Sequence, residues 1–238
     1  MLRFSQFDYL SFDCYGTLID WERGILSYLR PLLWDNGAPV PDEDILNLYS
    51  EFEPREQESP YRTYREILAA VVRHFADQYG FRVSESEAAG LAESIRDWQP
   101  FPDTVPALQR LKTRYKLAVL SNIDDDLFAL TAPKLGVDLD LVVTAQQVRS
   151  YKPSLRNFET LLQRLPVPKE RLLHVAESLY HDVVPAQSLG IATVWLNRRQ
   201  GRPAAATRLV AAKPGREAPT VEALADIALS GPGEARIR

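Results

Sequence analysis

Tyr9-Leu10-Ser11-Phe12-Asp13-Cys14-Tyr15-Gly16-Thr17 is the stretch of sequence that decides the fold. A short apolar strand over residues 9–12 leads directly into Asp13, and Gly16 then permits a turn. A carboxylate at the end of a buried strand is costly unless its surroundings use its charge. Ligands of open α/β sheets bind at this carboxyl edge. The stretch therefore predicts a catalytic nucleophile at Asp13, with the Thr17 hydroxyl close to it.

The composition is that of an ordinary globular protein, with 45% hydrophobic and 25% charged residues among 238. A net charge of -4 and the lack of a basic stripe give no reason to expect nucleic acid. The apolar runs are shorter than the ~20 residues of a membrane span, and the first residues lack the apolar core of a signal peptide. A single cysteine, Cys14, excludes an internal disulfide framework. We therefore expect a cytoplasmic protein without nucleic-acid or membrane partners.

The second half of the chain alternates short apolar strands with helical patterns. We predict strands at residues 116–121, 141–144, 172–176 and 191–196, and helices at about 124–134, 155–165 and 180–189. This alternation is typical of a parallel sheet with helices on both faces, joined by right-handed crossovers. The sequence thus predicts a doubly wound, Rossmann-like α/β core. Residues 200–219 are predicted as a surface loop, and the tail beyond Ser230 as frayed.

Residues 20–98 show helical spacing of apolar residues and no strand-like run. Clusters of Pro and Gly punctuate this region. We predict a cap subdomain of four helices, inserted into a core that comprises residues 1–19 and 99–238. Asp103 or Thr104 is expected to cap the helix that follows the return to the core.

Polar groups follow the predicted strands at four places. They are Asp13 and Thr17 after the first strand, Ser121 and Asn122 after the second, Lys152 in the loop after the third, and Glu177, Ser178 and Asp182 after the fourth. Because the carboxyl ends of parallel strands converge on one edge, we expect these groups to form one site. The four places in this order are a stronger signal than any single member. His74, His174 and His181 lack metal-ligand spacing, and we predict no metal site from them.

This pattern resembles the haloacid dehalogenase (HAD) superfamily over nearly the whole chain, cap included. Within it, Asp13-Cys14-Tyr15-Gly16-Thr17 is similar to the motif of the type II L-2-haloacid dehalogenases. HAD phosphatases generally carry a second aspartate two residues after the nucleophile, which protonates the leaving alcohol. Here that position is Tyr15. A departing halide needs no proton, so the resemblance implies a dehalogenase.

The resemblance implies a hydrolysis in two steps that needs no cofactor. Asp13 attacks the α-carbon of a small 2-substituted carboxylate and expels halide with inversion. Water then cleaves the aspartyl ester and releases a 2-hydroxy acid. Lys152 keeps Asp13 ionised, because a nearby positive charge favours the carboxylate. Asp182 orients Lys152 and, with Glu177, helps to activate the water.

The resemblance also implies the substrate contacts. Thr17 and Ser121 hydrogen-bond the nucleophile and the substrate carboxylate, the backbone N–H groups of Cys14 and Tyr15 hold an oxyanion or carboxylate, Tyr15 and Asn122 line the halide site, and Ser178 lies beside them. A cap arginine covers the substrate, with Arg55 as the first candidate and Arg62 and Arg65 as alternatives. The aromatic residues Trp21, Tyr61, Tyr64 and Trp98 are predicted to pack the cap, and one of them could face the cleft.

Three positions depart from the dehalogenase pattern. Glu177 replaces a serine, Leu179 stands where an asparagine positions the hydrolytic water, and Phe158 replaces a tyrosine six residues after the lysine. The motif around Asp13 and the segment 176–182 are also similar to a branch that contains an azetidine-2-carboxylate hydrolase, which opens a strained C–N bond. Both reactions attack a carbon α to a carboxylate.

Two alternatives to these hydrolases stay open. One is a Mg²⁺-dependent phosphatase, in which Glu177 and Asp182 would hold the metal. The other is a non-enzymatic HAD-like protein that retains the cleft for binding or assembly. The resemblance to the dehalogenases also allows a homodimer.

Overall fold

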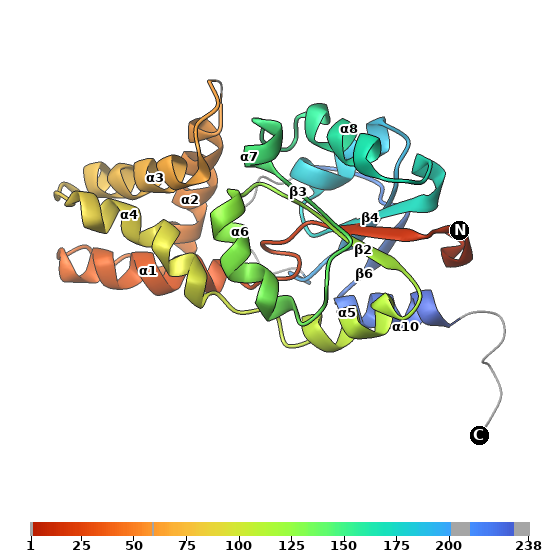
Figure 1. Ribbon diagram of the computed structural model, residues 1–238. Coiled ribbons are helices and arrows are strands. Elements are labelled where there is room, and N and C mark those ends of the chain that lie inside the picture. Colours follow the sequence, from red (N-terminus) through yellow and green to blue (C-terminus); the bar gives the residue numbers. More distant parts are fainter. Residues whose placement is uncertain (1, 59, 201–209, 231–238) are drawn as a thin grey trace.

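A six-stranded parallel sheet lies at the centre of the computed structural model, which describes residues 2–58, 60–200 and 210–230 (Figure 1). Its strands are β1 (Tyr9–Phe12), β2 (Lys116–Ser121), β3 (Leu141–Thr144), β4 (Leu172–Ala176), β5 (Ala192–Leu196) and β6 (Arg216–Ala218). They are ordered β3-β2-β1-β4-β5-β6, and every neighbouring pair is parallel. The predicted doubly wound α/β fold is confirmed.

Strand β1 occupies the middle of the sheet, between β2 and β4. Its last residue, Phe12, pairs with Val119 of β2 and Val175 of β4. From β1 the chain builds the sheet outward to β3 on one side and then crosses to β4 on the other. The carboxyl end of β1 is therefore the topological switch point, which is where open α/β sheets bind their ligands.

Helices cover both faces of the sheet (Figure 1). Helices α5 (Thr104–Lys112) and α10 (Val221–Leu229) pack together on one face, whereas α8 (Leu155–Arg164), α7 (Ala145–Val148) and α9 (Val184–Ser188) lie together on the other. Along β2, Leu117 and Val119 belong to one buried cluster, and Ala118 and Leu120 belong to the second. Because both faces are covered, the strands show the continuous apolar runs from which they were predicted.

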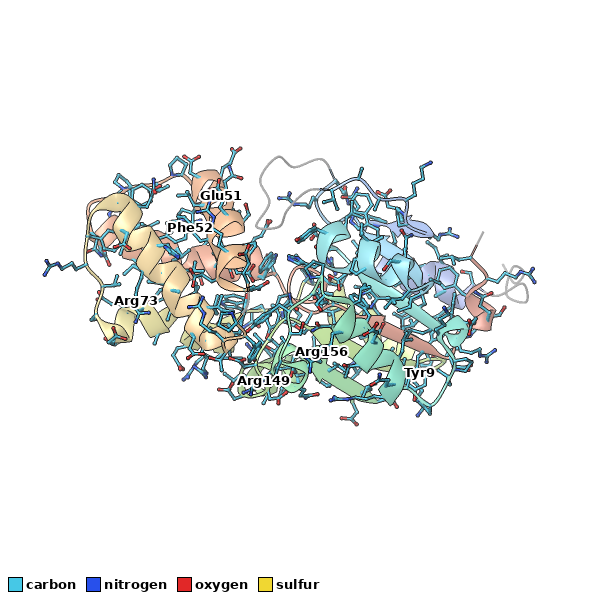
Figure 2. The ribbon with its side chains drawn as sticks, turned by 90° about the horizontal axis from the view of Figure 1, so that it is seen from above. Tyr9, Glu51, Phe52, Arg73, Arg149 and Arg156 are labelled. Carbon is cyan, nitrogen blue, oxygen red and sulfur yellow. The ribbon has the colours of Figure 1, made fainter. Side chains whose placement is uncertain are left out.

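Four helices between β1 and β2 form an insertion beside the carboxyl edge of the sheet (Figure 1). They are α1 (Trp21–Asp35), α2 (Asp42–Glu56), α3 (Tyr64–Tyr79) and α4 (Glu85–Ser94). Capping boxes begin α3 at Thr63 and α4 at Ser84, and the left-handed Gly80 ends α3. Tyr9, at the start of β1, lies at the far end of the molecule from Glu51 and Phe52 of α2, so the carboxyl end of β1 faces the insertion (Figure 2).

The local predictions need four corrections. The predicted loop 200–219 contains the edge strand β6, whose three residues give too short a pattern to be recognised, while residues 201–209 and the tail beyond Ser230 lie outside the described residues. The helix predicted at 124–134 consists of two parts. These are the α-helix α6 (Asp125–Thr131) and a 3₁₀ turn at Ala132–Leu135 that contains Pro133. The helix predicted at 180–189 is a π-helical turn at Leu179–Val183 followed by α9, whose Pro185 lacks the N–H of a continuous ladder.

The fourth correction concerns the start of α5. Asp103 precedes this helix, but its side chain does not cap it. The carboxylate accepts hydrogen bonds from the Arg198 guanidinium and from the backbone N–H of Val221 instead. The Thr104 hydroxyl donates to the carbonyl of Leu18, so neither residue has the predicted capping role.

In the described part of the chain, no helix has the length and the apolar character that would be needed to cross a membrane.

Candidate active site

Asp13 stands at the carboxyl end of β1, with its side chain almost entirely buried. Its backbone N–H continues the pairing to β4 by donating to the carbonyl of Val175. The Thr17 hydroxyl donates to Asp13 Oδ2 at 2.8 Å and accepts the backbone N–H of Glu177 at 2.9 Å. Thr17 thus joins the turn after β1 to the end of β4. Gly16 permits this turn with a φ of 92°.

Lys152 lies between two carboxylates in the core. Its Nζ donates to Asp13 Oδ1 at 2.8 Å, to Asp182 Oδ1 at 2.6 Å and to the carbonyl of Leu120 at 3.0 Å. An ammonium group has three donors, and all three are used here. Asn122 holds the backbone of Lys152 in place. Its side-chain amide accepts from the backbone N–H of Lys152 at 2.7 Å and donates to the Lys152 carbonyl at 3.0 Å.

A buried histidine extends this network into the sheet. His174 Nε2 lies 3.0 Å from Asp182 Oδ1, and its Nδ1 lies 2.8 Å from Ser11 Oγ on β1. The Phe158 ring packs edge-on against His174 at 5.3 Å between centroids. Two neighbouring strands therefore hold Asp182, which in turn holds Lys152. The sequence indicates no metal-ligand spacing for His174, and it gives no signal for this positioning role.

The network sets the charge of each member. Burial alone would lower the pKa of Lys152, but the two carboxylates outweigh it and raise this pKa above its ordinary value. Burial would raise the pKa of Asp182, but Lys152 and His174 outweigh it and lower the pKa. At Asp13, burial and the nearby Asp182 prevail over Lys152 and Thr17 and raise the pKa. A carboxylate with a raised pKa, held beside an ammonium, is a more basic nucleophile than one in water.

A small pocket lies at Asp13, between the sheet edge and the helical insertion. Its volume is about 40 Å³. The core contributes Asp13, Tyr15, Ser121, Asn122, Lys152, Ser178, His181 and Asp182, and the insertion contributes Trp21, Glu53 and Tyr64. All of the predicted core groups except Cys14, Thr17 and Glu177 thus line one pocket. Such a pocket suits a substrate of few atoms.

Ser121 is the core residue with the clearest capacity for a ligand. Its hydroxyl is buried, and no hydrogen-bond partner is found for it in the described structure. Ser178, by contrast, accepts from the backbone N–H of His181 at 3.0 Å and lies 3.2 Å from its Nδ1. Because buried polar groups are normally hydrogen-bonded, the Ser121 hydroxyl is suited to a substrate oxygen.

Position 15 supplies no acid to the pocket. The Tyr15 hydroxyl lies 2.8 Å from the Thr131 hydroxyl, and its ring packs edge-on against Trp98. Burial raises the pKa of Tyr15 well above its usual value, so this side chain stays neutral. The preceding Cys14 is fully buried in the core, and burial also raises the pKa of its thiol. Only the backbone of Cys14 therefore remains as a candidate for substrate contact.

The structure places Arg55, predicted as a substrate contact, outside the pocket. Its side chain is 65% exposed and pairs with Glu51 on the same helix. Side chains two positions apart on an α-helix point in nearly opposite directions. Because Glu53 of α2 faces the pocket, Arg55 faces away from it. The alternatives Arg62 and Arg65 do not line the pocket either: Arg62 pairs with Glu56, and Arg65 pairs with Glu93 and Asp126.

Glu53 is the pocket residue that sequence reasoning missed entirely. It is 5% exposed, and its Oε1 lies 3.2 Å from the Tyr64 hydroxyl, which in turn lies 3.1 Å from the Tyr49 hydroxyl. Burial raises the pKa of Glu53 to about 7. A signal for it exists, since Glu53 follows Leu46 and Tyr49 at helical spacing on the apolar face of α2. An acid on the apolar face of a helix indicates a buried charge with a functional role.

The structure places the Glu177 side chain outside the Asp13 pocket. Its carboxyl faces a neighbouring pocket and lies 3.9 Å from Arg199 Nε. Burial raises the pKa of Glu177 to about 8. Successive residues of an extended segment point to opposite sides, so Ser178 faces the Asp13 pocket and Glu177 does not. This placement contradicts the prediction that the carboxyl of Glu177 activates the water.

The residues at this edge do not fit a magnesium ion. The Lys152 ammonium occupies the space between Asp13 and Asp182, and the third acid, Glu177, faces elsewhere. Over the described ranges, no group of three or more His, Cys, Asp and Glu side chains is arranged to hold a metal ion.

The chain matches the model of the haloacid dehalogenase-like hydrolases over residues 7–190. The (S)-2-haloacid dehalogenase 4A of Burkholderia cepacia is 28% identical over 208 residues, which cover 81% of this chain and 83% of that protein. A glyceraldehyde 3-phosphate phosphatase of Methanothermobacter thermautotrophicus is 27% identical over 193 residues, covering 78% and 84%. The L-2-haloacid dehalogenase structure from Xanthobacter autotrophicus with chloropropionic acid covalently bound has a TM-score of 0.76 at 19% identity, covering 93% and 98%, which shows a shared fold.

Proposed function

Because this chain belongs to the haloacid dehalogenase-like hydrolases, we propose that it hydrolyses a bond at the α-carbon of a small 2-substituted carboxylate through an ester on Asp13. The observation that carries this proposal is the buried Asp13 carboxylate, which is held on Oδ1 by Lys152 and on Oδ2 by Thr17. Each oxygen keeps a lone pair that is free to attack. The simplest leaving group is halide, since a curated relative carries the name 2-haloacid dehalogenase.

The first step is an in-line displacement. One oxygen of Asp13 attacks the α-carbon from the side opposite the leaving group, and the electron pair of the broken bond departs with that group. Lys152 stabilises the carboxylate before the attack, and its remaining contacts to Asp182 and the Leu120 carbonyl hold it in place afterwards. The Ser121 hydroxyl is available for the substrate carboxylate.

The second step returns Asp13 to its starting form. Water attacks the ester carbonyl of Asp13, the alkyl oxygen departs with one proton of that water, the other proton passes to solvent, and a 2-hydroxy acid is released. The Thr17 hydroxyl and Lys152 face the carboxyl oxygens of Asp13 and stabilise the negative charge that develops on the carbonyl oxygen. Each step thus uses groups that already contact Asp13.

Two observations weigh against the phosphatase alternative. Position 15 carries a neutral tyrosine instead of the acid that would protonate a leaving alkoxide. The described residues also include no group of three or more His, Cys, Asp and Glu side chains arranged to hold a metal ion. C–N hydrolysis of the azetidine-2-carboxylate type remains a second candidate, and the observation that favours it is Glu53 in the pocket.

A single turnover in H₂¹⁸O tests the ester. We would incubate excess enzyme separately with 2-chloropropionate and with azetidine-2-carboxylate, and locate the label by mass spectrometry. We expect ¹⁸O in the Asp13 carboxyl group and unlabelled oxygen in the product. Label in the product alone would mean that water attacks the substrate directly. Phosphate release from p-nitrophenyl phosphate that EDTA abolishes, without turnover of either carboxylate, would favour the phosphatase.

A further inference from the structure

Glu53 is a buried carboxyl group that takes no part in the attack by Asp13 or in the hydrolysis of the ester. It belongs to α2 in the insertion and faces the pocket that contains Asp13. Its hydrogen-bond partners are the Tyr64 hydroxyl and the Gln57 amide, both uncharged. Over the described residues, no Lys, Arg or His side chain forms an ion pair with Glu53. Burying an acid without a cationic partner is costly, so a partner supplied by a ligand would remove that cost.

The charges around the pocket point to the nature of that ligand. With Glu53 ionised, three carboxylates face a single cation, Lys152, among the side chains that line the pocket. His181 adds no positive charge, because burial lowers its pKa to about 4. A substrate with a carboxylate alone would bring a further negative charge into this surplus. A substrate that also carries a protonated amine would bring no net charge and would place its cation against Glu53.

We propose that Glu53 determines specificity by binding the protonated amine of a small amino-carboxylate substrate. This inference rests on the proposed attack by Asp13 and names the class of substrate that it acts on. The Tyr49–Tyr64 hydroxyl pair fixes the orientation of Glu53 Oε1. The Trp21 ring closes the same side of the pocket and offers an aromatic surface to a cation. On the core side, the unpartnered Ser121 hydroxyl faces the pocket as a donor to the substrate carboxylate.

Calorimetric titration with two unreactive ligands tests the binding role of Glu53. The ligands are butanoate and 4-aminobutanoate at pH 8.5, where Glu53 is ionised because its pKa is about 7. We expect the wild type to bind 4-aminobutanoate on the order of tenfold more tightly, which corresponds to about 1.4 kcal/mol. In Glu53→Gln the preference should fall to roughly twofold or less, whereas Glu51→Gln, an exposed acid on the same helix, should keep it.

The proposal is overturned if the wild type shows no preference for 4-aminobutanoate, or if Glu53→Gln keeps the preference. Thermal unfolding of each variant establishes that it is folded under the conditions of the titration.

Turnover of a second matched pair separates this inference from the proposed function. Chloride release is measured from 2-chlorobutanoate and from 4-amino-2-chlorobutanoate, which share the leaving group and the reacting carbon. We expect a higher kcat/KM for the amino compound in the wild type and equal values in Glu53→Gln. Chloride release without any preference would overturn the role of Glu53 and leave the attack by Asp13 intact. Conversely, a binding preference without ¹⁸O transfer to Asp13 from any substrate would reject the reaction and keep the binding role.

Discussion

On the core side of the pocket, the protein itself supplies a cation, Lys152, to the buried carboxylates of Asp13 and Asp182, whereas on the insertion side the hydrogen-bond partners of Glu53 are uncharged. The nucleophile must be ionised before the substrate arrives, so its counter-charge has to be part of the protein. A charge that recognises a ligand gains most when the ligand brings the partner. The contrast therefore separates the machinery of the reaction, on the sheet, from the choice of substrate, on α2.

The largest loss of turnover is expected from Asp13→Asn, on the core side of the pocket. This change removes the nucleophile at nearly constant volume, and Lys152 keeps its contacts to Asp182 and the Leu120 carbonyl. We expect kcat to fall on the order of 10⁴- to 10⁶-fold, as for other enzymes that lose a covalent nucleophile. Steady-state kinetics and circular dichroism provide the measurement. Residual activity within tenfold of the wild type would place the nucleophile elsewhere.

Lys152→Met tests whether the core charges depend on one another. The variant leaves Asp13 and Asp182 buried without a cation, and breaking a buried pair in this way costs about 3–5 kcal/mol. We expect the free energy of unfolding, measured by urea titration at pH 7, to fall by that amount. Turnover should fall as well, because the pKa of Asp13 rises further once Lys152 is gone. Adding Asp13→Asn should restore part of the lost stability, and a purely additive double variant would contradict the coupling.

Sequence reasoning located the core side because one rule governs it. Parallel strands in register bring their carboxyl ends to one edge, so Asp13, Ser121 and Lys152 were predicted together although they are far apart in the chain. The rule does not specify the direction in which a side chain points once the chain has left the strand. Glu177 was therefore assigned to the site although its side chain faces the opposite way from that of Ser178.

The insertion side was not predictable by the same argument. Which face of α2 meets the pocket depends on how four helices pack, and no motif records that arrangement. An arginine was sought there because of a family resemblance, whereas the acid at Glu53 was visible only as an irregularity on an apolar helix face. The apolar periodicity that identified the helices is insensitive to the single polar residue that matters for the ligand.

On the insertion side, the buried charge of Glu53 is tested by the pH dependence of the free energy of unfolding. The folded-state pKa of Glu53 is about 7, above its ordinary value of 4.5. The folded state therefore binds the proton more tightly, and the stability that this provides is complete below pH 4.5 and lost as the pH rises through 7. Glu53→Gln has no carboxyl group to ionise and therefore avoids that loss. From pH 4.5 to pH 8.5, its free energy of unfolding should gain up to about 3 kcal/mol relative to that of the wild type. Urea titrations at both values provide the measurement, and equal pH dependence of the two proteins would contradict the buried charge.

Arg55→Ala is the smallest change and separates the two descriptions of α2. If an arginine of this helix covered the substrate, its loss would raise KM strongly, because a charged hydrogen bond to the substrate carboxylate would disappear. The structure instead places Arg55 in solvent, paired with Glu51 one turn earlier. Such an exposed pair contributes at most about 0.5 kcal/mol. We therefore expect kcat, KM and the free energy of unfolding to stay close to the wild type. A KM raised tenfold or more would mean that α2 rotates on substrate binding and brings Arg55, not Glu53, to the pocket.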